Sequence, residues 1–180
     1  MVDPKGDRLA APLMQAFRAA HQARDAKARD DVREGGERVL SSRRTSSRTP
    51  ISESELRKIV IADVGALLNT VNFNSAQDLS EAPEVAKSIL NFGFPDLTRL
   101  SIDEDAVFGI ARELEAALRD FEPRLVRGSI KARRDETVSP DELRVRFLVG
   151  AALKMRPVDV PVQFVAEVEL DSGKIKIDRL

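Results

Sequence analysis

Residues 121–133 decide the fold, and they read FEPRLVRGSIKAR. Before Pro123 the apolar residues recur at steps of three and four, which is the period of a helix with one buried face. After Arg124 they recur at every second position, which is the period of a strand with one buried face. Proline lacks a backbone N–H and cannot continue a helix. We therefore predict a helix that ends near Phe121, a stiff corner at Glu122-Pro123-Arg124, and strands beyond the corner.

Three helices are predicted before the corner. The first covers residues 52–70 and the third covers residues 101–121, and each starts with a capping box in which a serine precedes a glutamate by three positions. The second is short and lies between Pro83, which favours a helix start, and Gly93, which favours a helix end. Its apolar face is predicted to be Val85, Ala86, Ile89 and Leu90.

Four strands are predicted after the corner, at residues 126–133, 143–149, 162–170 and 175–177. Residues 171–174 read Asp-Ser-Gly-Lys and predict a tight turn between the last two strands. Short connections imply antiparallel pairing. The predicted fold class is therefore α+β, with three body helices followed by a small antiparallel β-meander.

Residues 1–49 are predicted to form an amino-terminal arm and charged linker, partly helical or disordered, ahead of a folded domain at residues 50–180. The segment 41–48 has almost nothing to bury. Leu13, Phe17 and Ala20 share one helical face, which either docks a partner or folds back on the body. The arm has a small excess of basic residues, but acidic residues are interspersed, which argues against nucleic-acid binding.

The composition excludes several kinds of site. The chain has no cysteine, tryptophan or tyrosine, and its single histidine, His21, lies in the arm. Thiolate chemistry, sulfur-bound metals and histidine-based catalysis therefore have no support, and we expect no cofactor and no metal. No apolar run reaches the ~20 residues of a membrane helix, and the start of the chain lacks the layout of a secretory signal. We expect a cytoplasmic protein without direct membrane insertion.

Three blocks resemble the TssE family of type VI secretion baseplate subunits, which is related to the wedge proteins of contractile phage tails and was historically labelled lysozyme-like. Residues 64–70 resemble the family's Leu-Leu-Asn-Thr helix ending, residues 88–98 resemble its Ser-Val-Leu-Asn-Tyr-Gly-Leu-Pro-Asp-Leu-Thr block, and residues 122–124 match its Glu-Pro-Arg motif. The order and spacing of the blocks agree with the family. Phe92 stands where the family usually has tyrosine, and the arm is longer and more charged than we would expect.

This resemblance implies a non-enzymatic baseplate subunit, with residues 50–180 as the wedge-like domain and Glu122, Pro123 and Arg124 as partner-binding residues. The implied partners are the wedge subunits TssF and TssG, TssK, and the sheath proteins TssB and TssC. The family likeness also implies strand addition by the sheath, with residues 162–170 and 175–178 as the receiving edge. From the residues alone, an internal salt bridge between Glu122 and Arg124 remains the alternative reading of the corner.

The alternative function is a lysozyme-like glycoside hydrolase acting on peptidoglycan. Such an enzyme needs two carboxyl groups that face each other across a sugar cleft. The candidate pairs, Asp120 with Glu122 and Glu113 with Glu115, are two residues apart on a helix and do not face each other. We therefore expect no catalytic residue. The basic strand face lacks the aromatic residues that stack on nucleic-acid bases, so we expect it to meet an acidic protein surface or solvent; it comprises Arg127, Lys131, Arg133, Arg144 and Arg146.

Overall fold

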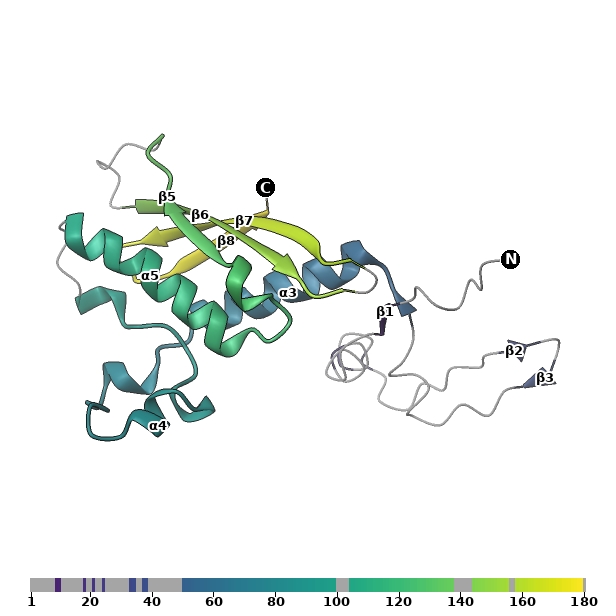
Figure 1. Cartoon of the computed structure of the whole chain (residues 1–180), viewed down its shortest axis with the longest axis horizontal. Helices are drawn as coiled ribbons and strands as arrows, with labels where there is room; N and C mark the ends of the chain where they lie inside the picture. The colour runs from purple at the N-terminus through teal and green to yellow at the C-terminus, as the bar shows by residue number, and fades with distance from the viewer. Residues whose placement is uncertain are drawn as a thin grey trace. The chain divides into compact units, whose positions relative to one another are not determined.

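The computed structural model of the chain describes residues 9–10, 18, 21, 24, 33–34, 37–38, 50–99, 104–137, 144–155 and 158–179 (Figure 1). The predicted helical face of the arm, the linker at residues 41–48 and the serine of the second capping box lie outside these residues. The chain divides into two compact units, residues 1–57 and 58–180. In the first unit, β1 (Leu9–Ala10) pairs with β4 (Pro50–Ile51), and β2 (Arg33–Glu34) pairs with β3 (Glu37–Arg38).

The described residues contain three α-helices: α3 (Glu53–Leu68), α4 (Pro83–Ala86) and α5 (Glu104–Phe121). α3 begins at the predicted capping box, where the backbone N–H of Glu55 donates to Ser52 Oγ at 3.2 Å. Both long helices bury an apolar stripe, as their three- and four-residue spacing predicts. The stripe of α3 includes Ile59, Val60, Val64, Leu67 and Leu68, and that of α5 includes Ile110, Leu114, Ala117 and Leu118.

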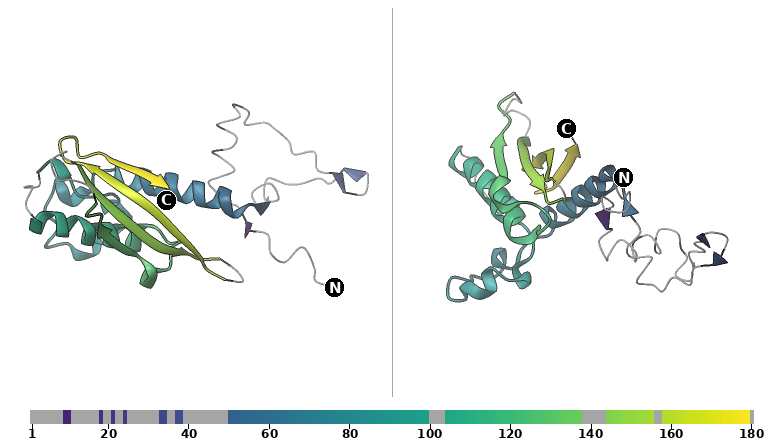
Figure 2. Two further views of the ribbon diagram at one scale, coloured as in Figure 1. Left: turned by 90° about the horizontal axis from the view of Figure 1, so that it is seen from above. Right: turned by 45° about the vertical axis from the view of Figure 1, so that its right-hand side comes forward.

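The sheet has four antiparallel strands in the order β5-β6-β7-β8. They are β5 (Lys131–Arg134), β6 (Arg144–Leu153), β7 (Val160–Glu169) and β8 (Ile175–Arg179). Alternate residues of β6 are buried, including Val145, Phe147, Val149, Ala151 and Leu153. α5 and the body of α3 cover the same face of this sheet (Figure 2). The predicted α+β fold class, with helices followed by a meander, is confirmed.

Among the element boundaries that differ from the prediction, two bear on the site. The first strand was predicted to begin at Val126, but residues Arg127–Ser129 form a 3₁₀ turn, η4, and the strand starts at Lys131. Ser129 causes this turn: its backbone N–H and its hydroxyl both donate to Val126 O, at 2.9 Å and 2.7 Å. The second helix stops after one turn at Ala86, and a separate 3₁₀ turn, η2 (Ile89–Asn91), follows it.

Gly93 brings the segment after η2 back against the end of α3. Its φ is +132°, and a Cβ at this position would lie 2.3 Å from Thr70 O and 2.9 Å from Asn72 N. The neighbouring backbone bonds run from Phe94 N to Thr70 O at 2.7 Å and from Asn72 N to Phe94 O at 2.9 Å. This position therefore requires glycine for its conformation and for the close approach of the backbones.

Candidate protein-docking sites

An ion pair within the corner joins the two charged residues that the sequence singled out. Glu122 directly follows α5, and only 4% of it is exposed. Its Oε1 accepts hydrogen bonds from Arg124 Nε at 2.6 Å and from the Arg124 backbone N–H at 3.1 Å, and its Oε2 accepts one from Arg124 Nη2. Pro123 fixes the chain direction between them. The internal pair, which the sequence left open as an alternative, is therefore present, and partner binding by the corner stays a prediction.

A carboxylate from α3 completes this cluster, which we call the corner clamp: Asp63, Glu122 and Arg124. Asp63 Oδ2 lies 2.8 Å from Arg124 Nη2. Burial lowers the pKa of Arg124, but the hydrogen bonds and charges of Glu122 and Asp63 outweigh burial and raise the pKa above its ordinary value. Arg124 therefore stays charged across the neutral range. Sequence reasoning missed Asp63, because its partner Arg124 lies far from it in the chain.

The corner is also joined to the end of β6 through its backbone. Lys154 N donates to Arg124 O at 2.8 Å, and Val126 N donates to Ala152 O at 2.8 Å. The Lys154 ammonium donates to Pro123 O at 2.9 Å. Helix α3, the end of α5 and the sheet thus meet at the corner clamp, which orients the corner rigidly and leaves Pro123 exposed.

Residues 71–95 form a lobe on the side of the helices away from the sheet (Figures 1 and 2). Ile89 and Leu90 were predicted to belong to the second helix, and this prediction is wrong: they lie in the separate turn η2, where they are 81% and 71% exposed, whereas Asn91 is buried. The cause is hydrogen bonding by polar side chains, which favours turns over a continuing helix. Asn91 Nδ2 donates to Ala86 O at 2.8 Å, and Asn91 Oδ1 accepts from Asn74 N at 2.8 Å.

An aromatic contact joins the lobe to the corner. The rings of Phe92 and Phe121 lie 5.5 Å apart, centroid to centroid, at an interplanar angle of 70°, which is the favourable edge-to-face arrangement. Phe121 directly precedes the corner clamp residue Glu122. Ile89 and Leu90 precede Phe92 in the chain, and Pro123 follows Phe121 by two positions, so we group these residues as the lobe–corner surface: Ile89, Leu90, Phe92, Phe121 and Pro123.

The sheet has its edges at β5 and β8, because β6 and β7 lie between them. The prediction that residues 162–170 form an edge is wrong for Phe164–Val168, which pair with β6 on one side and β8 on the other. Residues 160–163 pair with β6 but not with β8. The prediction that residues 175–178 form an edge is confirmed.

On each edge strand, the outward backbone groups of one residue bond to a side chain from a helix or from the residue that follows one. Asn69, just after α3, donates to Ile175 O at 2.7 Å and accepts from Ile175 N at 3.0 Å. Glu115 of α5 accepts from Ala132 N in β5 at 2.8 Å. We call Asn69 and Glu115 the edge guards. Because unpaired strand edges attract other strands, the guards shorten the length of edge that is free to pair.

Three of the four carboxylates considered for a hydrolase have other partners. Glu122 binds Arg124, Glu115 binds the backbone of Ala132, and Asp120 lies 3.1 Å from Arg119. The described residues hold no cluster of His, Asp or Glu able to bind a metal ion. On the basic strand face, Arg144 and Arg146 pair with Glu167 at 3.5 Å and 2.7 Å, which reduces the positive charge offered to a nucleic acid.

The family model described as baseplate wedge protein gp25 matches residues 54–158, more than half of the chain. No curated protein and no solved structure matches. Within the part of the chain that the structure describes, no helix is both long enough and apolar enough to cross a membrane.

Proposed function

The chain belongs to the baseplate wedge protein gp25 family, and from this premise we propose that it is the TssE-type subunit of a cytoplasmic type VI secretion baseplate. The family makes it a structural protein of the baseplate wedge. In the proposed role it joins the wedge to the first layer of the contractile sheath through protein–protein contacts, without catalysis. The sequence blocks at residues 64–70, 88–98 and 122–124 support the TssE type within the family.

The observation that carries this proposal is the lobe–corner surface. Large aliphatic side chains as exposed as Ile89 and Leu90 are typical of interaction sites when they cluster. Ile89 and Leu90 lie in a turn that hydrogen bonds of Asn91 and Ser88 stabilise, so this turn fixes the two side chains in an exposed position. In our proposal this surface binds TssF and TssG, with TssK in the same assembly. The corner clamp then orients the surface, and Glu122-Pro123-Arg124 contributes through Pro123 and the exposed part of Arg124.

The sheath attaches, in our proposal, by adding a strand of TssB or TssC to β8. Glu169 N donates to Lys174 O at 2.9 Å, so Lys174 and the alternate residues after it face β7. The backbone groups of Ile175, Ile177 and Arg179 therefore face outward. Because Asn69 already bonds to the backbone N–H and C=O of Ile175, an added strand begins pairing at Ile177.

Co-purification tests the wedge contact. Ile89→Ser combined with Leu90→Ser is expected to weaken capture of co-expressed TssF and TssG by about tenfold or more, as for central apolar anchors of interfaces. Val158→Ser is the matched control, since Val158 is 72% exposed and lies outside the lobe. If the double variant is folded and still captures both subunits like the wild type, the lobe–corner surface is not the wedge contact.

A proline substitution tests the sheath contact. Ile177→Pro removes an outward N–H but leaves the ladder to β7 intact, whereas Ile177→Ala loses similar packing and keeps the N–H. Sheath assembly by TssB and TssC on the reconstituted baseplate is expected to fail with Ile177→Pro and to proceed with Ile177→Ala. Urea unfolding of both variants separates loss of contact from loss of fold. Equal sheath assembly by the two folded variants would exclude β8 as the acceptor.

A further inference from the structure

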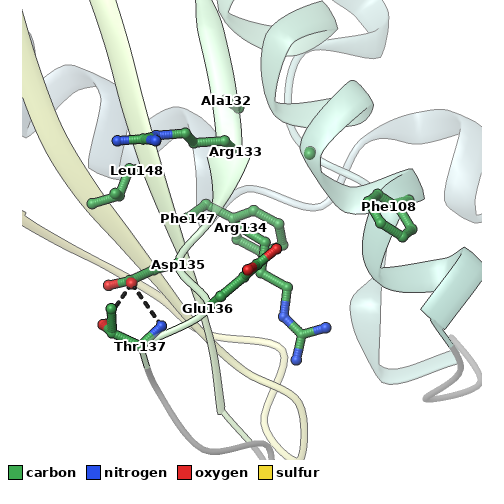
Figure 3. Close-up of a pocket in the computed structure, with 10 residues that line it drawn as sticks. Phe108, Ala132, Arg133, Arg134, Asp135, Glu136, Thr137, Phe147 and Leu148 are labelled. Atoms are coloured by element: carbon green, nitrogen blue, oxygen red, sulfur yellow. Dashed lines mark hydrogen bonds between the residues drawn. The ribbon is translucent and has the colours of Figure 1, made fainter.

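A groove lies between α5 and β5, at the edge of the sheet opposite to β8 (Figure 3). Its volume is about 560 Å³. Phe108 and Ala111 of α5 form one wall, β5 and residues 135–137 form the other, and Phe147 and Leu148 of β6 also line it. Phe108 is 64% exposed, which is unusual for a phenylalanine beside a core. The groove therefore offers an apolar wall next to a strand edge.

The backbone of β5 offers hydrogen-bonding groups to this groove. Asp135 N donates to Arg146 O at 2.8 Å, so by alternation Lys131 and Arg133 bond to β6, and Ala132 and Arg134 face the open side. Glu115 occupies Ala132 N. The C=O of Ala132 and both backbone groups of Arg134 have no partner within residues 104–137 and 144–155. Their spacing along one edge matches the pairing pattern of an added strand.

The side chains define the charge of the occupant. Arg134 stands opposite Phe147 in the ladder, and Figure 3 shows its guanidinium on the side of Phe108, whereas the Arg133 guanidinium lies toward Leu148. Arg134 has no ion-pair partner among the residues that the structure describes. The Asp135 carboxylate accepts from Thr137 N at 3.1 Å and Thr137 Oγ1 at 2.6 Å, and no ion pair joins Arg134 to Glu136, which also lines the groove. A guanidinium in this setting fits a carboxylate.

We propose that the groove between α5 and β5 binds an extended segment of a partner protein, which adds to β5 as a strand. Alternate side chains of an added strand point to the same face. The segment therefore places an apolar side chain against Phe108 and Ala111 and, two positions away, an acidic side chain against Arg134. Its backbone bonds to Arg134 and to the C=O of Ala132, and Glu115 sets the end of the pairing. This site goes beyond the proposed function, because it uses the edge that the sheath contact leaves free.

Titration of the full-length protein with a synthetic peptide tests the proposal. The probe is Ac-Thr-Leu-Thr-Glu-Thr-NH2, and binding is followed by amide NMR shifts. Shifts are expected at residues 108–111 and 132–137 and not in β8. Arg134→Ser is expected to weaken binding about tenfold or more, the loss of a charge-assisted hydrogen bond. Phe108→Ser is expected to weaken it as well. Arg133→Ser is the matched control, because it removes the same charge from the neighbouring residue on the other face.

Three results would overturn the proposal. They are the absence of saturable binding, shifts that map to β8 or to the lobe, and equal weakening by Arg133→Ser and Arg134→Ser. A probe with lysine in place of glutamate that binds as tightly would remove the role of Arg134 and overturn it too. If the groove already holds a segment of this chain, the probe does not shift residues 132–137, and the partner segment is excluded. Capture of TssF and TssG by Arg134→Ser checks the proposed function separately, since that capture is expected to be unchanged.

Discussion

At the scale of single residues, the corner clamp places a buried carboxylate and a partly buried guanidinium in direct contact. Glu122 is nearly fully buried, and Arg124 bonds to it and to Asp63. A buried ion pair gains little over well-packed apolar residues, but removing one partner leaves an unpaired charge in a low-dielectric site. We therefore expect the clamp to fix the orientation of the corner more than to add to the free energy of unfolding.

The clamp predicts a pattern of stabilities among variants. Arg124→Met alone is expected to lower the free energy of unfolding by about 3 kcal/mol, because it leaves Glu122 buried and unpaired. Glu122→Met combined with Arg124→Met is expected to lose less than Arg124→Met alone, since both members of the pair are then absent. Urea denaturation measures both, with Asp120→Asn as the exposed control. A double variant that is much less stable than the single one would contradict this account.

Part of the corner clamp could be predicted from the sequence. The Glu122–Arg124 pair was a stated alternative because the two residues flank a proline, and that relation is local. Asp63 and the Asn69–Ile175 bonds were missed because each joins positions far apart in the chain, and only the pairing of elements brings them together. One sequence without aligned relatives carries no record of such pairs.

At the scale of elements, the lobe shows where helical periodicity misleads. Residues 83–90 carry apolar side chains at helical spacing, yet the helix ends at Ala86. Ser88 Oγ accepts from Leu90 N at 3.2 Å and donates to Val85 O at 2.9 Å, so local polar bonds replace the next helical turn. The long helices α3 and α5 were predicted well because their stripes extend over several turns and outweigh such local competition.

Closure of the lobe depends on Gly93. Gly93→Ala is expected to lower the free energy of unfolding by more than about 3 kcal/mol, since the positive φ is strained for alanine and the new Cβ would overlap Thr70 O. Gly128→Ala is the matched control, because a Cβ there meets nothing within 4 Å. Its expected effect is between none and a gain of about 1 kcal/mol. Thermal or urea unfolding compares the two, and similar losses in both would show that Gly93 has no special role.

At the scale of the whole molecule, the four-stranded sheet has two edges, and each carries one edge guard. The α+β class followed from the switch in period at residues 121–133, which is a local signal. The strand order was not predictable in the same way. Apolar and polar residues alternate in β7, which does not tell whether a strand lies at the edge, and β7 is paired on both sides over Phe164–Val168. Which backbone groups remain free for partners is thus a property of the assembled sheet and of the helices packed on it.

The edge guards predict how the protein behaves when they are removed. Asn69→Ala leaves the backbone N–H and C=O of Ile175 on β8 without a side-chain partner, and Glu115→Ala does the same for the backbone N–H of Ala132 on β5. With both edges extended, β5 of one molecule can pair with β8 of the next, and such a head-to-tail contact does not close on itself. The double variant is therefore expected to associate into open-ended species as concentration rises. Sedimentation velocity across a concentration series measures this.

The matched control is Asn69→Ala with Glu115→Gln, because glutamine keeps a carbonyl that can accept from Ala132 N. With one edge still guarded, association is expected to stop at a dimer, since only two β8 edges remain to pair. Fold is checked in parallel by urea unfolding, because loss of the Asn69 bonds also costs stability. A folded double variant that sediments like the wild type at every concentration would show that the guards serve internal packing alone. Open-ended association by the control variant would show that β8 can associate without a freed β5.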